Sequence, residues 1–304
     1  MVLESARMPS TAAPRGHVIT DDGRRLSYDQ IGDPAGVPVF LLHGTPGSRV
    51  SALHAHPERV AAASLCVITY DRPGYGGSSR HAGRRVVDCV GDVVAIADEL
   101  GLEQFAVSGG SGGGPHALAV AARLPGRVRL AACDVGAAPY GAPDLDWFAG
   151  MDPVNVRELH CALSGEETLT AVLEEQARDV LARVDKDPDA LFGEVELSAS
   201  DRAVLEQPDV REVLRISTRE MFAQGVAGWV DDDLALVSPW GFDVREIAVP
   251  VKIRYGEGDV LVPAAHGRWL VSHVPGAQAT IDRDRGHLST PDQHLERLRA
   301  LLFA

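Results

Sequence analysis

The chain has 304 residues, of which 45% are hydrophobic, and its formal net charge at pH 7 is −14. This apolar content is sufficient for a large core, which excludes disorder as the state of the whole chain. The acidic balance argues against nucleic acid or an anionic membrane surface as a partner, since both require concentrated Lys and Arg.

The amino end and the cysteines bear on location. Residues 1–16 contain no apolar core run and are predicted to be a flexible tail rather than a secretory signal. No segment approaches the ~20 apolar residues of a membrane span. The cysteines show no metal-ligand spacing, and they are Cys66, Cys89, Cys133 and Cys161. We therefore expect reduced, mostly buried thiols and a cytoplasmic protein, while monomer and homodimer both stay open.

The first half of the chain alternates strand and helix patterns. Residues 17–20 and 26–31 flank an Asp-Asp-Gly turn and are predicted to form a hairpin. Apolar runs typical of strands buried on both faces follow at 37–42, 65–70, 105–107 and 128–133. Helical patterns lie between them at about 50–63, interrupted at Pro57, and at 86–100. This order predicts a mostly parallel sheet with helices on both faces.

The pattern changes after Gly136. Helical patterns without a strong strand run occur at 154–163, 166–184, 200–206 and 210–224. Strands return at 249–255 and 277–281, followed by a closing helix at 291–302. We interpret 137–238 as a helical cap inserted over a site, with 17–136 and 239–304 forming an eight-stranded α/β core.

The stretch around Ser111 organises the chain. Gly109 and Gly113 bracket the serine in a G-x-S-x-G pattern, between an apolar run and an alanine-rich helical pattern. This spacing is typical of a nucleophile elbow, a tight strand-to-helix turn that projects the hydroxyl above the sheet edge. By itself the pattern also fits an ordinary flexible turn or a phosphate-binding loop.

A reactive serine needs partners. Its hydroxyl requires a base to take the proton, and a histidine base requires an acid that orients the ring and offsets its charge. Ser111, Asp259 and His287 each follow a predicted strand, as a shared site at one sheet edge requires. Asp134 is the competing acid. The rival histidines are His43, expected to brace its loop, His54 and His56, expected in an exposed helix, His116, and His266, expected to be solvated.

Further site residues follow from the loops. The loop at 43–48 holds two glycines and a proline, and the amide of Thr45 is the candidate to face Ser111 across an oxyanion. Asp71 and Arg72 are expected to be a paired acid and base that hold the next loop in place. Candidates for an apolar pocket, of which about a third should contact ligand, are Pro139, Pro143, Trp147, Phe148, Met151, Met221, Phe222 and Trp229. Nearer the serine, the pocket candidates are His43, Gly44, Gly110, His116 and Val260.

Five segments together resemble the α/β-hydrolase fold family with a helical cap, from about residue 17 to the end. They are HGTPG at 43–47, DRPGYGGS at 71–78, GGSGG at 109–113, GEGD at 256–259 and GH at 286–287. The resemblance implies Ser111 as nucleophile, His287 as base and Asp259 as orienting acid. It also implies the amides of Thr45 and Gly112 as oxyanion hole, and neither a metal nor an organic cofactor.

The resemblance implies a serine hydrolase acting on a small ester, thioester, lactone or amide through an acyl-enzyme, with a carboxylic ester hydrolase as the leading expectation. Proline iminopeptidases and serine-based carbon–carbon bond hydrolases are similar in these motifs. A ligand receptor or a non-hydrolytic lyase on the same fold is the alternative of another class. The residues of the cap would set the choice among these substrates.

Overall fold

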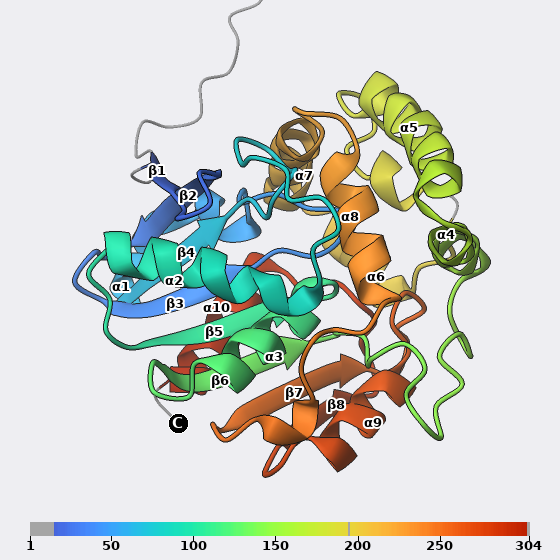
Figure 1. The fold of residues 1–304 in the computed structure, drawn as a ribbon. Coiled ribbons are helices and arrows are strands. Elements are labelled where there is room, and N and C mark those ends of the chain that lie inside the picture. Colours follow the sequence, from blue (N-terminus) through green and yellow to red (C-terminus); the bar gives the residue numbers. More distant parts are fainter. Residues whose placement is uncertain (1–14, 194, 303–304) are drawn as a thin grey trace, which may run out of the picture.

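The computed structural model describes residues 15–193 and 195–302, and its centre is an eight-stranded sheet (Figure 1). The strands are β1 (Arg15–Ile19), β2 (Arg25–Gly32), β3 (Val37–Leu42), β4 (Leu65–Tyr70), β5 (Phe105–Gly110), β6 (Val128–Asp134), β7 (Val251–Gly256) and β8 (Gln278–Asp282). Their spatial order is β1-β2-β4-β3-β5-β6-β7-β8. β2 pairs antiparallel with β1 and β4, and the remaining pairs are parallel. The predicted mostly parallel sheet and its opening hairpin are confirmed.

The tail predicted at 1–16 is corrected at its end, because Arg15 and Gly16 pair with β2 as part of β1. Residues 1–14 lie outside the described residues.

Helices cover both faces of the sheet because its strands alternate apolar side chains between two cores. Val39 and Leu41 of β3 pack with residues of α1 (Pro57–Ala62) and α10 (Pro291–Leu302). Phe40 and Leu42 belong to the larger core on the other face, together with residues of α2 (Cys89–Glu99), α3 (Gly113–Arg123) and α9 (Ala264–His273). The short 3-10 helices of this part are η1 (Ala52–Ala55), η2 (Val86–Asp88) and η4 (Val244–Glu246).

Between β6 and β7 the chain forms a second group of helices, which we call the inserted helices. They are α4 (Pro153–Ser164), α5 (Glu166–Arg183), α6 (Ala199–Leu205), α7 (Pro208–Met221) and α8 (Ala227–Leu236), with η3 (Ala190–Phe192) between α5 and α6. They gather at one side of the sheet (Figure 1) and have a hydrophobic cluster of their own around Trp229. The four predicted helices are present to within a few residues, whereas α8 was not predicted.

The sequence pattern hides α8 because three consecutive aspartates resemble an exposed polar segment. In the structure Asp231, Asp232 and Asp233 are each at most 2% exposed. Asp231 forms an ion pair with Arg80 at 2.9 Å, and Asp232 lies at the centre of a buried polar network. Aspartates are therefore compatible with a buried helix here because the core supplies partners for their charge.

The network around Asp232 joins α8 to the loops of the core. Its carboxylate accepts hydrogen bonds from Arg72 at 2.6 Å, Arg84 at 2.8 Å, and the hydroxyls of Thr45 and Tyr75 at 2.9 Å each. Burial alone would raise the pKa of Asp232, but the two guanidinium groups hold it well below its usual range. The carboxylate therefore stays ionised inside the protein.

The expected pairing of Asp71 with Arg72 is corrected by these contacts. Asp71 accepts hydrogen bonds from the amides of Arg49 and Gly77 and pairs with the Arg49 guanidinium. Arg72 turns instead to Asp232 and to the carbonyl groups of His43 and Gly44. Both residues hold loops in place, as expected, but through other partners than each other.

Replacing Asp232 by alanine should lower the free energy of unfolding by about 3–5 kcal/mol, because two buried guanidinium groups would lose their common counter-charge. Urea denaturation of both proteins measures the difference. The matched control is Asp185→Asn, since Asp185 is 62% exposed in its pair with Arg219 and its loss should leave the unfolding free energy nearly unchanged. Equal effects of the two substitutions would contradict the importance of the buried network.

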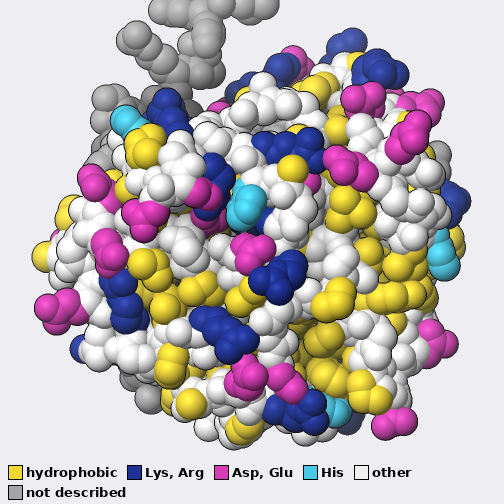
Figure 2. Space-filling view, in the orientation of Figure 1, with side chains coloured by type: hydrophobic (Ala, Val, Ile, Leu, Met, Phe, Trp, Pro, Cys, Tyr) yellow, Lys and Arg dark blue, Asp and Glu magenta, His cyan; other side chains and the backbone are white. Residues whose placement is uncertain are grey.

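The remaining observations concern membrane spans, surface charge and the cysteines. No helix in the described part of the chain is both long and apolar enough for a membrane crossing. On the face seen in Figure 2, Lys and Arg side chains are interspersed with Asp and Glu rather than gathered into one basic area. The four cysteines are free thiols, and Cys66, Cys89 and Cys133 are buried, as the strand-like runs predicted for two of them.

Candidate active site

Ser111 lies in the sharp turn between β5 and α3 and has a backbone φ of +53°. This left-handed conformation is unfavourable for a residue with a side chain and costs on the order of 1–3 kcal/mol. The turn is tight because a Cβ atom on Gly109 would overlap the carbonyl oxygen of Gly113, and one on Gly113 would overlap that of Leu42. The amide of Ser111 donates to the carbonyl of Asp134 at 2.9 Å. The serine is therefore held at the carboxyl edge of the sheet.

His287 and Asp259 form a direct hydrogen bond at the same edge. Nδ1 of His287 donates to Oδ2 of Asp259 at 2.8 Å, and the two side chains are only 7% and 0% exposed. Oδ1 of Asp259 accepts from the amides of Leu261 and Val262, at 2.9 Å each, which fixes the carboxylate. The two loops are joined by a bond from the amide of Gly258 to the carbonyl of Arg285.

The electrostatics of His287 follow from these contacts. Burial alone lowers the pKa of the imidazole, but the charge of Asp259 and its hydrogen bond, with a smaller contribution from Asp201, raise it above the usual value. An imidazole held in this way is stabilised when it accepts a proton, which is what a general base does.

The competing acid and bases have other partners. Asp134 forms an ion pair with Arg254 at 3.2 Å. His43 accepts a hydrogen bond from the amide of Arg72 and contacts the carbonyl of Gly44, so it braces its loop as expected. His54 and His56 contact Asp29 and Asp209, and the side chain of His54 is only 10% exposed rather than on an open surface.

The expectation that His266 is solvated is wrong, because its side chain is fully buried. Its Nδ1 accepts from the amide of Ala138 and its Nε2 contacts the carbonyl of Trp147. Burial lowers its pKa to about 4. His116 is also buried, its Nδ1 contacts the carbonyl of Gly112, and burial lowers its pKa to about 3. Both imidazoles are neutral parts of the packed interior.

The loop after β3 lies against the serine turn. A Cβ atom on Gly44 would lie 3.3 Å from Cβ of Ser111, and one on Gly112 would lie 3.1 Å from the amide nitrogen of Thr45. The segments that carry the two predicted oxyanion amides are thus adjacent. Arg72 and Asp232 hold this loop from behind through the carbonyl of Gly44 and the hydroxyl of Thr45.

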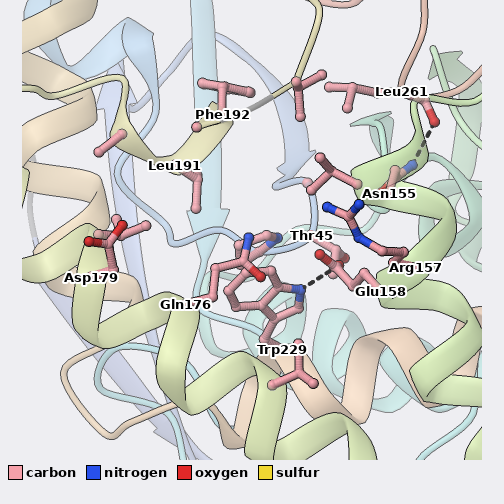
Figure 3. A pocket seen from close by; sticks show the side chains of 18 of the residues that line it. Thr45, Asn155, Arg157, Glu158, Gln176, Asp179, Leu191, Phe192, Trp229 and Leu261 are labelled. Carbon is pink, nitrogen blue, oxygen red and sulfur yellow. Dashed lines mark hydrogen bonds between the residues drawn. The ribbon is translucent and has the colours of Figure 1, made fainter.

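A cavity of about 1020 Å³ opens above these groups. Ser111 and His287 line it together with Gly44, Thr45 and Leu288 at the sheet edge. Its other walls come from α4, α5, the region of η3, and Trp229 of α8, and Figure 3 shows Asn155, Glu158, Gln176 and Phe192 around the space. At this size the cavity suits a drug-sized molecule.

Two of the expected pocket residues line this cavity. Of the candidates, Gly44 and Trp229 line the cavity, whereas His43, Gly110, His116, Trp147, Phe148, Met151, Met221, Phe222, Val260, Pro139 and Pro143 are not among its lining residues. Trp147 packs its ring edge-on against Phe148 and His266, while Met221 and Phe222 belong to the hydrophobic cluster of the inserted helices. α4 and α5 supply the walls instead.

Glu158, which lines the cavity, and its neighbour Asp233 were missed by the sequence analysis. Glu158 of α4 accepts a hydrogen bond from the indole of Trp229 at 2.9 Å, a contact drawn in Figure 3. Burial raises its pKa to about 7, and burial together with the charge of Glu158 raises the pKa of Asp233 well above its usual value. Burial therefore favours the protonated form of both carboxyl groups. Within a helical pattern Glu158 resembles any solvent-facing charge, so no sequence signal marks it.

No group of His, Cys, Asp or Glu side chains in the described ranges has an arrangement suited to a metal ion.

Comparison with known proteins decides the family. The profile described as alpha/beta hydrolase fold matches residues 37–292. The chain belongs to the α/β-hydrolase fold family. A proline iminopeptidase from Xylella fastidiosa (strain Temecula1) is 26% identical over 95% of both chains. Rhodomycin D methylesterase DauP from Streptomyces sp. (strain C5) is 27% identical over 89% of this chain and 91% of its own.

Solved structures give the same family fold. The enol-lactonase from Burkholderia xenovorans LB400 superposes with a TM-score of 0.68 and 20% identity, covering 95% of this chain and 100% of that one. The iminopeptidase and the methylesterase, which align along most of the chain, are both hydrolases, and this protein is a hydrolase.

Proposed function

We propose that this hydrolase cleaves a small-molecule ester, thioester, lactone or amide through an acyl-enzyme on Ser111. The observation that carries the proposal is the 2.8 Å bond between Asp259 and His287, with the histidine and Ser111 lining one cavity. A carboxylic ester is the favoured substrate, since a methylesterase aligns with almost the whole chain.

In the proposed mechanism Oγ of Ser111 attacks the substrate carbonyl carbon while Nε2 of His287 takes the hydroxyl proton. Asp259 keeps the other proton on Nδ1 and offsets the charge of the imidazolium. The amides of Thr45 and Gly112 bind the oxygen that becomes negative. His287 then gives its proton to the leaving alcohol as the carbon–oxygen bond breaks. A water molecule then attacks the acyl carbon while His287 takes its proton. His287 returns this proton to Oγ of Ser111 as the bond between carbon and Oγ breaks, which releases the acid.

We also propose that residues 137–238 act as a cap that encloses the substrate. Support comes from the cavity, whose walls away from Ser111 are formed largely by α4, α5 and the η3 region. A cavity of about 1020 Å³ is larger than a short acyl chain requires. The acid or alcohol part of the substrate is therefore expected to be bulky.

A panel of p-nitrophenyl esters with increasing acyl length, measured beside aminoacyl-naphthylamides, tests this function. We expect hydrolysis of the esters with kcat/KM that rises with acyl size, because larger acyl groups bury more apolar surface against the inserted helices. Absence of turnover in both series, with no reaction of the folded protein with a fluorophosphonate, would favour a ligand receptor or a lyase.

Glu158 favours a second candidate, an aminopeptidase related in action to the proline iminopeptidases. A carboxyl group in the cavity wall, bonded to Trp229, can accept a hydrogen bond from a substrate ammonium group. In that case Glu158→Gln should reduce kcat/KM for aminoacyl-naphthylamides by about 10- to 100-fold and leave neutral esters unaffected. The matched control is Glu175→Gln, because Glu175 lines the same cavity from α5 but is exposed.

A further inference from the structure

The backbone on either side of His287 is bonded to one of the inserted helices. The amide of Gly286 donates to Oγ of Ser200 at 2.9 Å, and the amide of Leu288 donates to Oδ1 of Asp201 at 2.6 Å. Both acceptors lie in the first turn of α6. The peptide that carries the imidazole is thus held at two successive points by a segment more than eighty residues earlier in the chain.

Asp201 is fixed in this contact by burial and by hydrogen bonds. Its side chain is fully buried, with 0% exposure. Its second oxygen, Oδ2, accepts from the hydroxyl of Ser198 at 2.8 Å, and Ser198 in turn contacts the hydroxyl of Ser200 at the same distance. The carboxylate therefore has a single orientation, since each of its oxygens has a donor.

The loop of His287 is shaped to admit this carboxylate. A Cβ atom on Gly286 would overlap both Oδ2 of Asp201 and the hydroxyl of Ser198. A Cβ atom on Gly258, the neighbour of Asp259, would lie 3.6 Å from Cβ of Ser198. The start of α6 thus packs against the loops of both proposed catalytic partners, and glycine leaves the space that this close approach requires.

We propose that Asp201 is a positioning residue for His287, through which the inserted helices fix the imidazole relative to Ser111. The proposal rests on the function proposed above, in which His287 is the general base. Asp201 accepts from the amide of Leu288, and Ser200 accepts from the amide of Gly286. These two hydrogen bonds limit rotation of the peptide between them. The imidazole, held at Nδ1 by Asp259, then has little freedom to move away from the serine.

The charge of Asp201 adds to its geometric role. The carboxylates near the imidazole are Asp259 in the loop after β7 and Asp201 in α6, and both raise the pKa of His287 against the effect of burial. The cations of neighbouring elements have other contacts, since Arg285 pairs with Asp282 and Arg297 of α10 donates to Ser289. Arg157 and Glu158 of α4 line the cavity with His287. Removing the negative charge at 201 should therefore lower the pKa of His287.

The test compares Asp201→Asn and Asp201→Ala in the full chain. The amide oxygen of asparagine can still accept from Leu288, so Asp201→Asn removes mainly the charge. We expect the acid limb of its kcat/KM profile, measured with a p-nitrophenyl ester, to move to lower pH. Alanine also removes the acceptor, and we expect it to lower kcat by about 10- to 100-fold with little change in KM.

Controls separate this role from a general effect on folding or charge. Asp185→Asn removes one exposed carboxylate from the turn after α5 and should leave the pH profile where it is in the unchanged protein. If Asp201→Ala does not fold, Ser200→Ala, which removes the acceptor of the Gly286 amide, takes its place. The proposal would be overturned if Asp201→Asn lowered the melting temperature but left the acid limb of the kcat/KM profile unmoved.

The pKa of His287 measured by NMR keeps the two proposals distinguishable. If Ser111 is not the nucleophile, the ester assay fails in the unchanged protein and the proposed function fails with it. The imidazole titration still reports on Asp201 in that case. A His287 pKa that is the same in Asp201→Asn and in the unchanged protein defeats the positioning role alone.

Discussion

Replacing Ser111 by alanine should lower kcat for a p-nitrophenyl ester by on the order of 10⁵- to 10⁶-fold, which is what the loss of an activated serine typically costs. No other group at the elbow can form the acyl-enzyme in this mechanism. KM should change little, because the cavity walls from α4 and α5 stay in place. Alanine keeps a Cβ atom at a φ of +53°, so the strained turn, and with it the fold, should be preserved.

Steady-state kinetics measure this loss, and mass spectrometry after fluorophosphonate treatment checks its cause. The adduct should map to Ser111 in the unchanged protein and be absent from Ser111→Ala. The control is Ser164→Ala, because Ser164 is exposed and its hydroxyl donates to the carbonyl of His160 within α4. Retention of full turnover by folded Ser111→Ala would end the acyl-enzyme proposal.

Replacing Asp259 by asparagine should lower kcat by on the order of 10⁴-fold, as observed for the orienting acid of serine proteases. Oδ1 can still accept from the amides of Leu261 and Val262, so the loop should keep its shape. The amide NH₂ would then face Nδ1 of His287 in place of the carboxylate oxygen. The imidazole would have to accept there and carry its proton on Nε2, where it cannot act as a base.

The control for this substitution is Asp134→Asn, at the acid that competes with Asp259 in the sequence. Asp134 pairs with Arg254, so its loss should reduce stability while kcat stays within a few-fold of the unchanged value. Measuring kcat and urea denaturation for both variants separates the two effects. A larger loss of kcat for Asp134→Asn than for Asp259→Asn would indicate that Asp134, and not Asp259, is the acid that orients His287.

Several features of the protein were predictable because local sequence patterns encode them. Apolar runs and turn residues predicted all eight strands, and the glycines around Ser111 predicted the elbow whose φ is +53°. Chain order also placed Asp259 after β7 and His287 after β8, at the edge where parallel strands end. These predictions succeed because strand period, helix period and turn geometry depend on residues only a few positions apart.

Pairings between distant charges were decided by the tertiary structure. Asp232 resembles part of a solvated acidic run until Arg72 and Arg84 surround it, and Asp201 resembles an ordinary residue of a helix start until Leu288 donates to it. The same holds for Glu158, which is marked only by its contact with Trp229.

The sequence by itself thus determined the sheet, the elbow and the order of the three proposed catalytic side chains, because each has a local signature. Only the tertiary structure decided which helices wall the cavity and which buried carboxylates hold the loops. The physical reason is that the free energy of a buried charge depends on partners brought from elsewhere in the chain. The pattern of neighbouring residues in the sequence does not identify those partners.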